Sequence, residues 1–249
     1  MTKINGLLLA WLISFCTLAV AQQPSLSAPD KSRPAPDWPA IAADLESMHK
    51  GDQSLRMELT ELTVAARAKG AELDKATSEA IWKKINEQDG ANQKRVAVIL
   101  DTYGWPPKSK VGAEASTTAF LVVQHAGLDY QVKYMESMRA AVDSGEAAKQ
   151  QFALLEDRVL LRQGKSQRFG SQVDTTGGVG LRSVEDPDNL DKRRATMGLG
   201  PICQYLEYFV KQAGPIVYPP CVKTAASVPA PAPASASVSA PVPVGVKPQ

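Results

Sequence analysis

Residues 112–127 read GAEASTTAFLVVQHAG, and the apolar run inside this stretch decides the fold. The run predicts a helix bounded by Gly112 and Gly127. A helix that is apolar on nearly every side is buried, because none of its faces suits water. We therefore expect this segment to be the central helix of a helical domain.

Amphipathic helices are predicted on both sides of the central one. The first begins at the cap Asp37, and Gly51 is expected to interrupt it. The second begins at about Asp74 and ends before residues 104–107 (GWPP), because proline cannot continue a helix. Two more helices follow the central one, over about residues 129–144 and 147–163.

The periodicity changes after the fifth helix. Residues 167–184 carry alternating apolar side chains around Thr175-Thr176-Gly177-Gly178, which predicts a β-hairpin with a glycine turn. Asp186 then caps a helix with Pro187 at its first position, and a last helix is expected over about residues 202–212. The fold class is therefore mainly α: a single domain of about six or seven helices with one small β-hairpin.

The first 21 residues have the pattern of a secretory signal peptide. Lys3 precedes an apolar run that ends in Ala19-Val20-Ala21, a small-x-small cleavage site. The alternative is a transmembrane anchor, but Asn5 shortens the run below the roughly 18–20 residues that a spanning helix needs. We expect a periplasmic or secreted protein that does not span the membrane after cleavage.

The composition divides the remaining chain into three parts. Residues 22–36 form a Pro-rich linker, residues 37–223 the helical domain, and residues 224–249 a tail of Pro, Ala, Ser and Val. Such a tail has no large side chains to bury and is expected to be disordered. It serves as a spacer or, as the alternative, as a polyproline recognition segment.

The charge distribution and the absence of known nucleotide-binding motifs argue against several classes of function. The formal net charge is +2, and no stripe of Lys and Arg with aromatic residues predicts nucleic-acid binding. The sequence contains neither a phosphate-binding Walker loop nor a dinucleotide glycine motif, and we expect no cofactor.

Cys203 and Cys221 remain after export and are expected to form a disulfide that stabilises the fold by roughly 3 kcal/mol. Two free thiols are the alternative.

Gln124 and His125 close the central helix. His125 there is either stabilised by the negative end of the helix dipole or placed at a pocket as an acid, base or ligand donor. No second histidine stands at a metal-binding spacing from it, so no metal is expected.

Glu156, Asp157 and Arg158 interrupt a Leu-rich helix. Consecutive helical residues point about 100° apart, so at least one of these charges must lie against protein. A structural ion pair is one interpretation, and a carboxylate held for a ligand or for His125 is the other. Two weaker signals are helical pairs, Asp52 with Arg56 and Asp89 with Asn92, a kind that is common on exposed faces and contributes little.

An ordered set of short blocks resembles a bacterial family known only as a domain of unknown function, number 6624. The blocks span about residues 44–206, and the chain departs from the family pattern at Phe169 and Ser171, where tyrosine and threonine are usual. The blocks are Asp52-Gln53-x-x-Arg56, Asp89-x-x-Asn92, Tyr103-Gly104-Trp105-Pro106, Gln124-His125-Ala126, Gln131, Leu155-Glu156-Asp157-Arg158, Gly164-Lys165-x-Gln167-x-Phe169-Gly170-x-Gln172 and Glu185-Asp186-Pro187.

The resemblance implies one shared pocket at the ends of several elements, where rigid scaffolds present functional groups. We expect Trp105 to wall it, Gln167 and Gln172 to donate and accept through their amides, and Arg158 to bind an anionic group. The further ligand-binding candidates are Gln124 and the two helical pairs that the resemblance includes, Asp52 with Arg56 and Asp89 with Asn92. In an enzyme, His125 is the general base, oriented by Asp157 or Glu156, for hydrolytic or transfer chemistry on an unknown small molecule. The alternative is a non-catalytic scaffold that binds an envelope component and is tethered through its tail.

Overall fold

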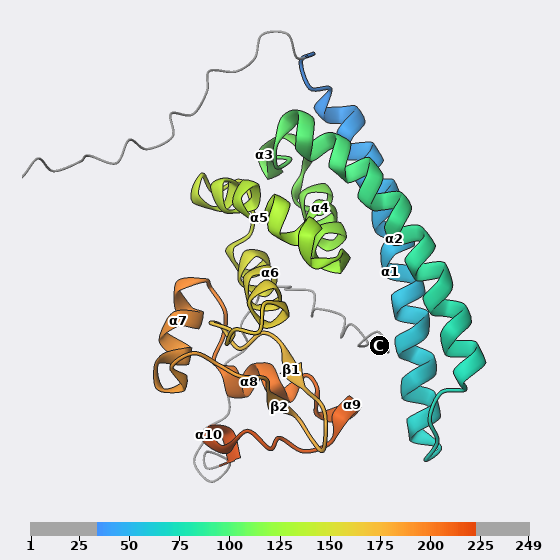
Figure 1. Cartoon of the computed structure of the whole chain (residues 1–249), viewed down its shortest axis with the longest axis vertical. Coiled ribbons are helices and arrows are strands. Elements are labelled where there is room, and N and C mark those ends of the chain that lie inside the picture. Colours follow the sequence, from blue (N-terminus) through green and yellow to red (C-terminus); the bar gives the residue numbers. More distant parts are fainter. Residues whose placement is uncertain (1–33, 223–249) are drawn as a thin grey trace, which may run out of the picture. The chain divides into compact units, whose positions relative to one another are not determined.

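The computed structural model describes residues 34–222; the predicted signal peptide, most of the linker and the tail lie outside the described residues. Within residues 34–222 the chain is mainly helical, as predicted, with seven helices of six residues or more and one two-stranded hairpin (Figure 1). The longer helices are α1 (Trp38–Ala68), α2 (Lys75–Tyr103), α4 (Ala113–His125), α5 (Leu128–Asp143), α6 (Lys149–Arg162), α7 (Leu190–Thr196) and α8 (Ile202–Glu207). Short helices are α3 (Lys108–Val111), α9 (Val210–Ala213) and α10 (Pro219–Val222). None of these helices is long and apolar enough to cross a membrane.

Helices α1 and α2 form a long antiparallel pair. The Asp37 side chain, the predicted cap of α1, accepts a hydrogen bond from Ala40 N. Asp74, where the second helix was expected to begin, caps α2 by accepting a hydrogen bond from Thr77 N. The prediction that Gly51 interrupts α1 is wrong, because α1 continues through it. A Cβ atom at Gly51 would lie 1.7 Å from Nε2 of Gln88, so the glycine makes room for a side chain of α2.

Helix α4 is central, as its composition predicts. It packs against α1, α2, α3, α5 and α6, and its buried side chains Ala115, Ala119, Phe120 and Val123 belong to the larger apolar core. In Figure 1, α6 continues from this group of helices toward the β-hairpin. Helix α6 thus takes part in the main core and also reaches the C-terminal elements.

The C-terminal part contains the predicted hairpin. Strand β1 (Val173–Asp174) pairs antiparallel with β2 (Gly180–Leu181), with Val173 opposite Leu181. A second apolar cluster lies under the hairpin and consists of Val179, Leu190, Ile202, Leu206, Phe209 and Cys221. The expected disulfide between Cys203 and Cys221 is present.

Two local predictions in this part are wrong. Asp186 makes no capping hydrogen bond; it has a φ of 40° and begins the 3-10 turn Pro187–Asn189 that precedes α7. The last helix is not continuous, since α8 ends at Glu207 and α9 begins at Val210.

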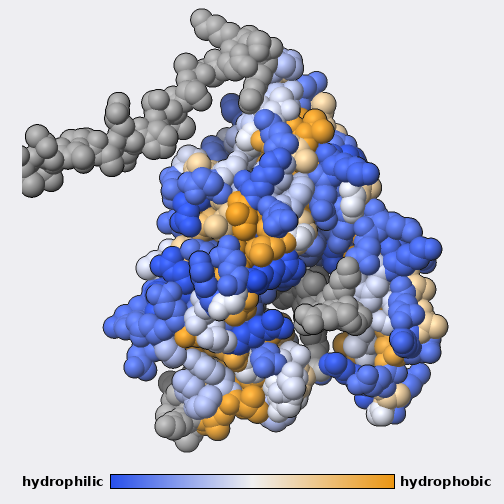
Figure 2. Space-filling model, in the orientation of Figure 1, coloured by the Kyte–Doolittle hydropathy of each residue, from blue (hydrophilic) through white to orange (hydrophobic). Residues whose placement is uncertain are grey.

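The face of the molecule in Figure 2 is mainly hydrophilic, with small separate apolar areas. The most exposed large apolar side chains of the described residues come from different parts of the chain: Val98 of α2, Tyr208 between α8 and α9, and Val222 of α10. Nothing on this face therefore resembles one continuous apolar docking surface.

Candidate functional site

His125, the last residue of α4, contacts a carboxylate of α1. Its Nδ1 lies 3.1 Å from Oδ1 of Asp52, and the two side chains are only 6% and 1% exposed. The other carboxylate oxygen, Oδ2, accepts a hydrogen bond of 2.6 Å from Nε2 of Gln53. Asp52 is therefore held on both sides and fixes the orientation of the imidazole ring.

Arg56 follows Asp52 by one helical turn and links α1 to α2. Its Nη2 lies 2.6 and 2.8 Å from the two carboxylate oxygens of Asp89, and its Nε lies 3.5 Å from Oδ1 of Asp52. The interpretation of Asp52 and Arg56 as an ordinary exposed pair is therefore wrong, because both side chains are buried where α1, α2 and α4 meet.

Burial and the neighbouring charges determine the protonation states of His125 and Asp52. Burial lowers the pKa of His125, and the hydrogen bond and charge of Asp52 only partly oppose that effect. Burial raises the pKa of Asp52, but the hydrogen bond and charge of His125 and the charge of Arg56 outweigh it, so the pKa is lowered. At neutral pH the site thus holds a neutral imidazole beside an ionised carboxylate. A proton on Nδ1, donated to Asp52, leaves the lone pair on Nε2, which has no hydrogen-bond partner within residues 34–222.

Asp52, Asp89 and His125 also form a group that could hold a metal ion, since one ligand atom from each lies within 4.8 Å of the others. Arg56 binds both oxygens of Asp89 and stands beside Asp52, where it already supplies a positive charge. A metal ion would have to displace this guanidinium. The donor set therefore fits a cluster neutralised by Arg56 better than it fits a metal centre.

Gln124 precedes His125 and contacts Arg158 of α6. With its amide oxygen turned toward the guanidinium, Gln124 accepts hydrogen bonds of 2.9 Å from Nε and 3.3 Å from Nη2 of Arg158. Burial, and then the charges of Arg162, Arg56 and Arg182, lowers the pKa of Arg158 to about 10. Gln124 and His125 are consecutive residues of α4, so the guanidinium of Arg158 is bound by the residue that precedes His125.

Asn92 lies one turn after Asp89 on α2 and is 3% exposed. Its Nδ2 has no hydrogen-bond partner, and neither has Nε of Arg56. A buried donor without a partner costs about 1–3 kcal/mol unless a water or a ligand accepts its hydrogen bond. Nε of Arg56 faces Oδ1 of Asp52 at 3.5 Å, so Nδ2 of Asn92 is the donor of this site that has no acceptor near it among the described residues.

Asp157 does not orient His125, which is a correction to the prediction from sequence. Its side chain is completely buried and accepts hydrogen bonds from the backbone N–H groups of Arg168, Phe169 and Ser171 at 2.7 to 3.2 Å. Burial raises the pKa of Asp157, and these donors oppose the rise. Asp157 fixes the chain that leads into the hairpin, so its role is structural.

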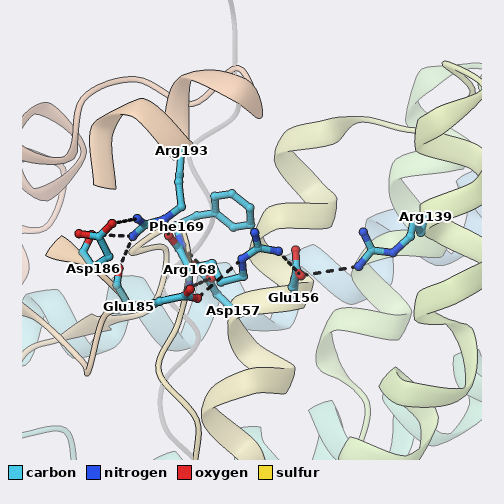
Figure 3. Close-up of polar contacts among 8 residues, drawn as sticks. All are labelled: Arg139, Glu156, Asp157, Arg168, Phe169, Glu185, Asp186 and Arg193. Atoms are coloured by element: carbon cyan, nitrogen blue, oxygen red, sulfur yellow. Dashed lines mark hydrogen bonds and ion pairs between the residues drawn. The ribbon is translucent and has the colours of Figure 1, made fainter. Parts of the chain in front are cut away.

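Glu156 likewise belongs to a network of α5, α6 and the hairpin region and not to the His125 site (Figure 3). Its Oε1 lies 3.1 Å from Nη1 of Arg168 and 3.6 Å from Nη2 of Arg139. Arg168 also lies 3.8 Å from Glu185. The expectation of a structural ion pair in the acidic triplet is met by Glu156, with two arginines as its partners.

The two hairpin glutamines hold backbone groups. Nε2 of Gln167 donates to the carbonyl oxygens of Gln172 and Arg182, and its Oε1 accepts from Gln172 N. Gln172 donates its own side-chain amide to Ser171 Oγ. These contacts stay within the segment 167–182, and none of the side-chain contacts in the described residues joins either glutamine to His125.

Trp105 is buried and packs in the main core. It borders a shallow groove with Pro107 and α5 residues Ser137 and Ala140, away from His125. The structure therefore groups His125 and Gln124 with Asp52, Arg56, Asp89, Asn92 and Arg158, and it leaves Trp105, Glu156, Asp157, Gln167 and Gln172 elsewhere.

Sequence reasoning missed the partner of His125. Asp52 precedes it by 73 residues, and no spacing rule connects residues so far apart on two helices. The basic neighbours Arg162 and Arg182 were also missed. The first has a recognisable position, one turn after Arg158 on α6, but nothing in the sequence places Arg182 near it.

In a comparison with known families, residues 39–217 match a family of unknown function (DUF6624). The match covers most of the chain, and the chain belongs to this family. No curated protein and no solved structure gives a significant match.

Proposed function

We propose that this DUF6624 domain is an exported protein that binds a small ligand beside His125 and acts on it with His125 as the general base. The observation that supports this most directly is the 3.1 Å contact between Nδ1 of His125 and the buried carboxylate of Asp52. A carboxylate in this position fixes the imidazole and stabilises the imidazolium that forms when Nε2 takes a proton.

The proposed chemistry is hydrolysis or group transfer. Nε2 of His125 takes a proton from water or from a hydroxyl group of the ligand, and the resulting nucleophile attacks an electrophilic centre. Gln124 and Arg158, next to this histidine, hold the ligand. Positioned acid–base catalysis of this kind contributes about 10²- to 10⁴-fold in rate.

The tautomer of His125 is the first test. Long-range ¹H–¹⁵N NMR spectra distinguish an imidazole protonated on Nδ1 from one protonated on Nε2. The proposal requires the Nδ1–H form at neutral pH in the wild type, and an Nε2–H form would overturn it, because Nε2 could not then accept a proton.

A second test uses turnover. We would assay chromogenic esters, phosphoesters and glycosides with the wild type and with His125→Gln, using Asp143→Asn as a control change on the exposed end of α5. The proposal expects an activity that His125→Gln reduces by about 100-fold or more. A function that survives His125→Gln but is lost when residues after 223 are deleted would instead support the scaffold hypothesis.

A further inference from the structure

Arg158 is a largely buried cation whose binding capacity is only partly used. A guanidinium has five N–H donors, and the Gln124 oxygen accepts from two of its nitrogen atoms, Nε and Nη2. No Asp or Glu side chain within residues 34–222 forms an ion pair with Arg158. The Nη1 edge is therefore available to an acceptor that the chain itself does not supply.

Positive charge accumulates around this side chain. Arg162, Arg56 and Arg182 all act on Arg158, and each of them disfavours its charged form. Arg56 is neutralised by Asp89, whereas Arg162 donates to the neutral carbonyl oxygen of Ala126 at 2.7 Å.

This arrangement opposes stability. Like charges around a buried cation raise the free energy of the folded state, and a salt bridge would relieve that cost. Elsewhere on α6 the chain does provide such partners: Glu156 faces Arg139 and Arg168. An unneutralised arginine a short distance along the same helix is what a binding site for an anion requires.

We infer that the ligand of the His125 site carries a phosphate group, which is bound by the guanidinium of Arg158 that Gln124 orients. The inference rests on the proposed function, because it names the substrate class of the same site. A guanidinium matches phosphate oxygens in a two-point contact, and Gln124 keeps its plane fixed. A phosphate dianion also balances more of the surrounding positive charge than a carboxylate does.

The experiment compares phosphate binding in three forms of the full chain. Titration calorimetry with phenyl phosphate, at constant ionic strength, is performed on the wild type, on Arg158→Gln and on the control Arg95→Gln. Arg95 is an exposed arginine of α2 whose partner is Asp44, so its replacement removes the same charge from a surface ion pair. We expect Arg158→Gln to weaken binding by about 10- to 100-fold, the value of one or two charge-assisted hydrogen bonds, and Arg95→Gln to leave it unchanged.

The melting temperature of Arg158→Gln, measured without phosphate, tests whether this variant is folded. Arg158→Gln removes a cation from a basic environment and keeps a donor for Gln124, so its melting temperature without phosphate should equal or exceed that of the wild type. As an independent readout, the Nε–H signal of Arg158 in the wild type should shift on addition of phenyl phosphate.

Three outcomes overturn the inference. They are no heat and no shift of the Arg158 signal with phenyl phosphate, equal binding of benzoate, and binding that Arg158→Gln leaves intact. His125→Gln separates this inference from the proposed function. Phosphate binding that persists in His125→Gln while the wild type lacks the Nδ1–H tautomer would retain the anion site and reject the general base.

Discussion

Replacement of Asp157 by Asn tests whether this carboxylate is structural. The change keeps the shape and volume of the side chain but replaces one of two acceptor oxygens with an NH₂ group. In the wild type, Oδ1 accepts from Arg168 N and Phe169 N, and Oδ2 accepts from Ser171 N at 2.9 Å and from Phe169 N at 3.2 Å. In the variant, an amide donor faces the N–H of Ser171.

The expected cost follows from these contacts. Ser171 is buried, so its unpartnered N–H costs about 1–3 kcal/mol. The remaining bonds to Oδ1 lose the assistance of a negative charge, roughly 1 kcal/mol each. Removing a buried charge returns part of this, since burial raises the pKa of Asp157 and thus disfavours its ionised form. We expect a net loss of about 2–4 kcal/mol in the free energy of unfolding.

Urea denaturation at neutral pH, followed by circular dichroism, measures this loss as a lower midpoint at an unchanged slope. Asp143→Asn is the matched control, because Asp143 is exposed and the same chemical change should alter stability by less than about 0.5 kcal/mol there. A variant Asp157→Asn as stable as this control would refute the structural assignment. It would also return Asp157 to the group of candidate catalytic residues.

Three further predictions concern the His125 site and the disulfide. Asp52→Asn should lower the pKa of His125 further, since the hydrogen bond and charge of Asp52 raise it. A ¹H NMR titration of the two histidines measures this shift. Asp101→Asn, the same chemical change at a carboxylate outside this site, is the control. Because the folded-state pKa of His125 is lowered from 6.5, the unfolded chain takes up a proton first, and stability should fall as the pH drops from 6.5 toward the folded-state pKa. His125→Gln should remove this part of the pH dependence in urea titrations, and an unchanged profile would contradict it. Replacing Cys203 and Cys221 together by alanine should cost about 3 kcal/mol, and equal unfolding midpoints of the oxidised protein and the variant would argue against a stabilising disulfide.

The sequence predicted the architecture well because local physics decides most of it. The apolar composition of residues 112–127 requires burial, and Asp37 and Asp74 cap helices through contacts within one turn. Gly51 was misjudged because its role depends on Gln88, a residue of another helix. Predictions from neighbouring residues in the sequence are reliable only where no contact with a residue of another helix changes the outcome.

The candidate site was predicted in part for the same reason. His125, Gln124 and Arg158 were recognised as polar residues in apolar surroundings, and the structure places them in one neighbourhood. The carboxylate that orients His125 could not be identified from the sequence. Asp52 and Asp157 both lie near an arginine in a predicted helix, so the sequence pattern does not distinguish them as partners of His125. Only the packing of α1 against α4 distinguishes them.

The two apolar clusters of this protein meet across a polar boundary. Asp157 of α6 binds the backbone that enters the hairpin, and Arg194 of α7 donates to the carbonyl oxygen of Phe169 in the same stretch. A protease cut or a deletion that removed residues 168–222 would take from α6 the backbone donors of Asp157 and the Arg168 partner of Glu156. The N-terminal bundle is therefore no independent module, and both halves should melt in a single cooperative step despite their separate cores.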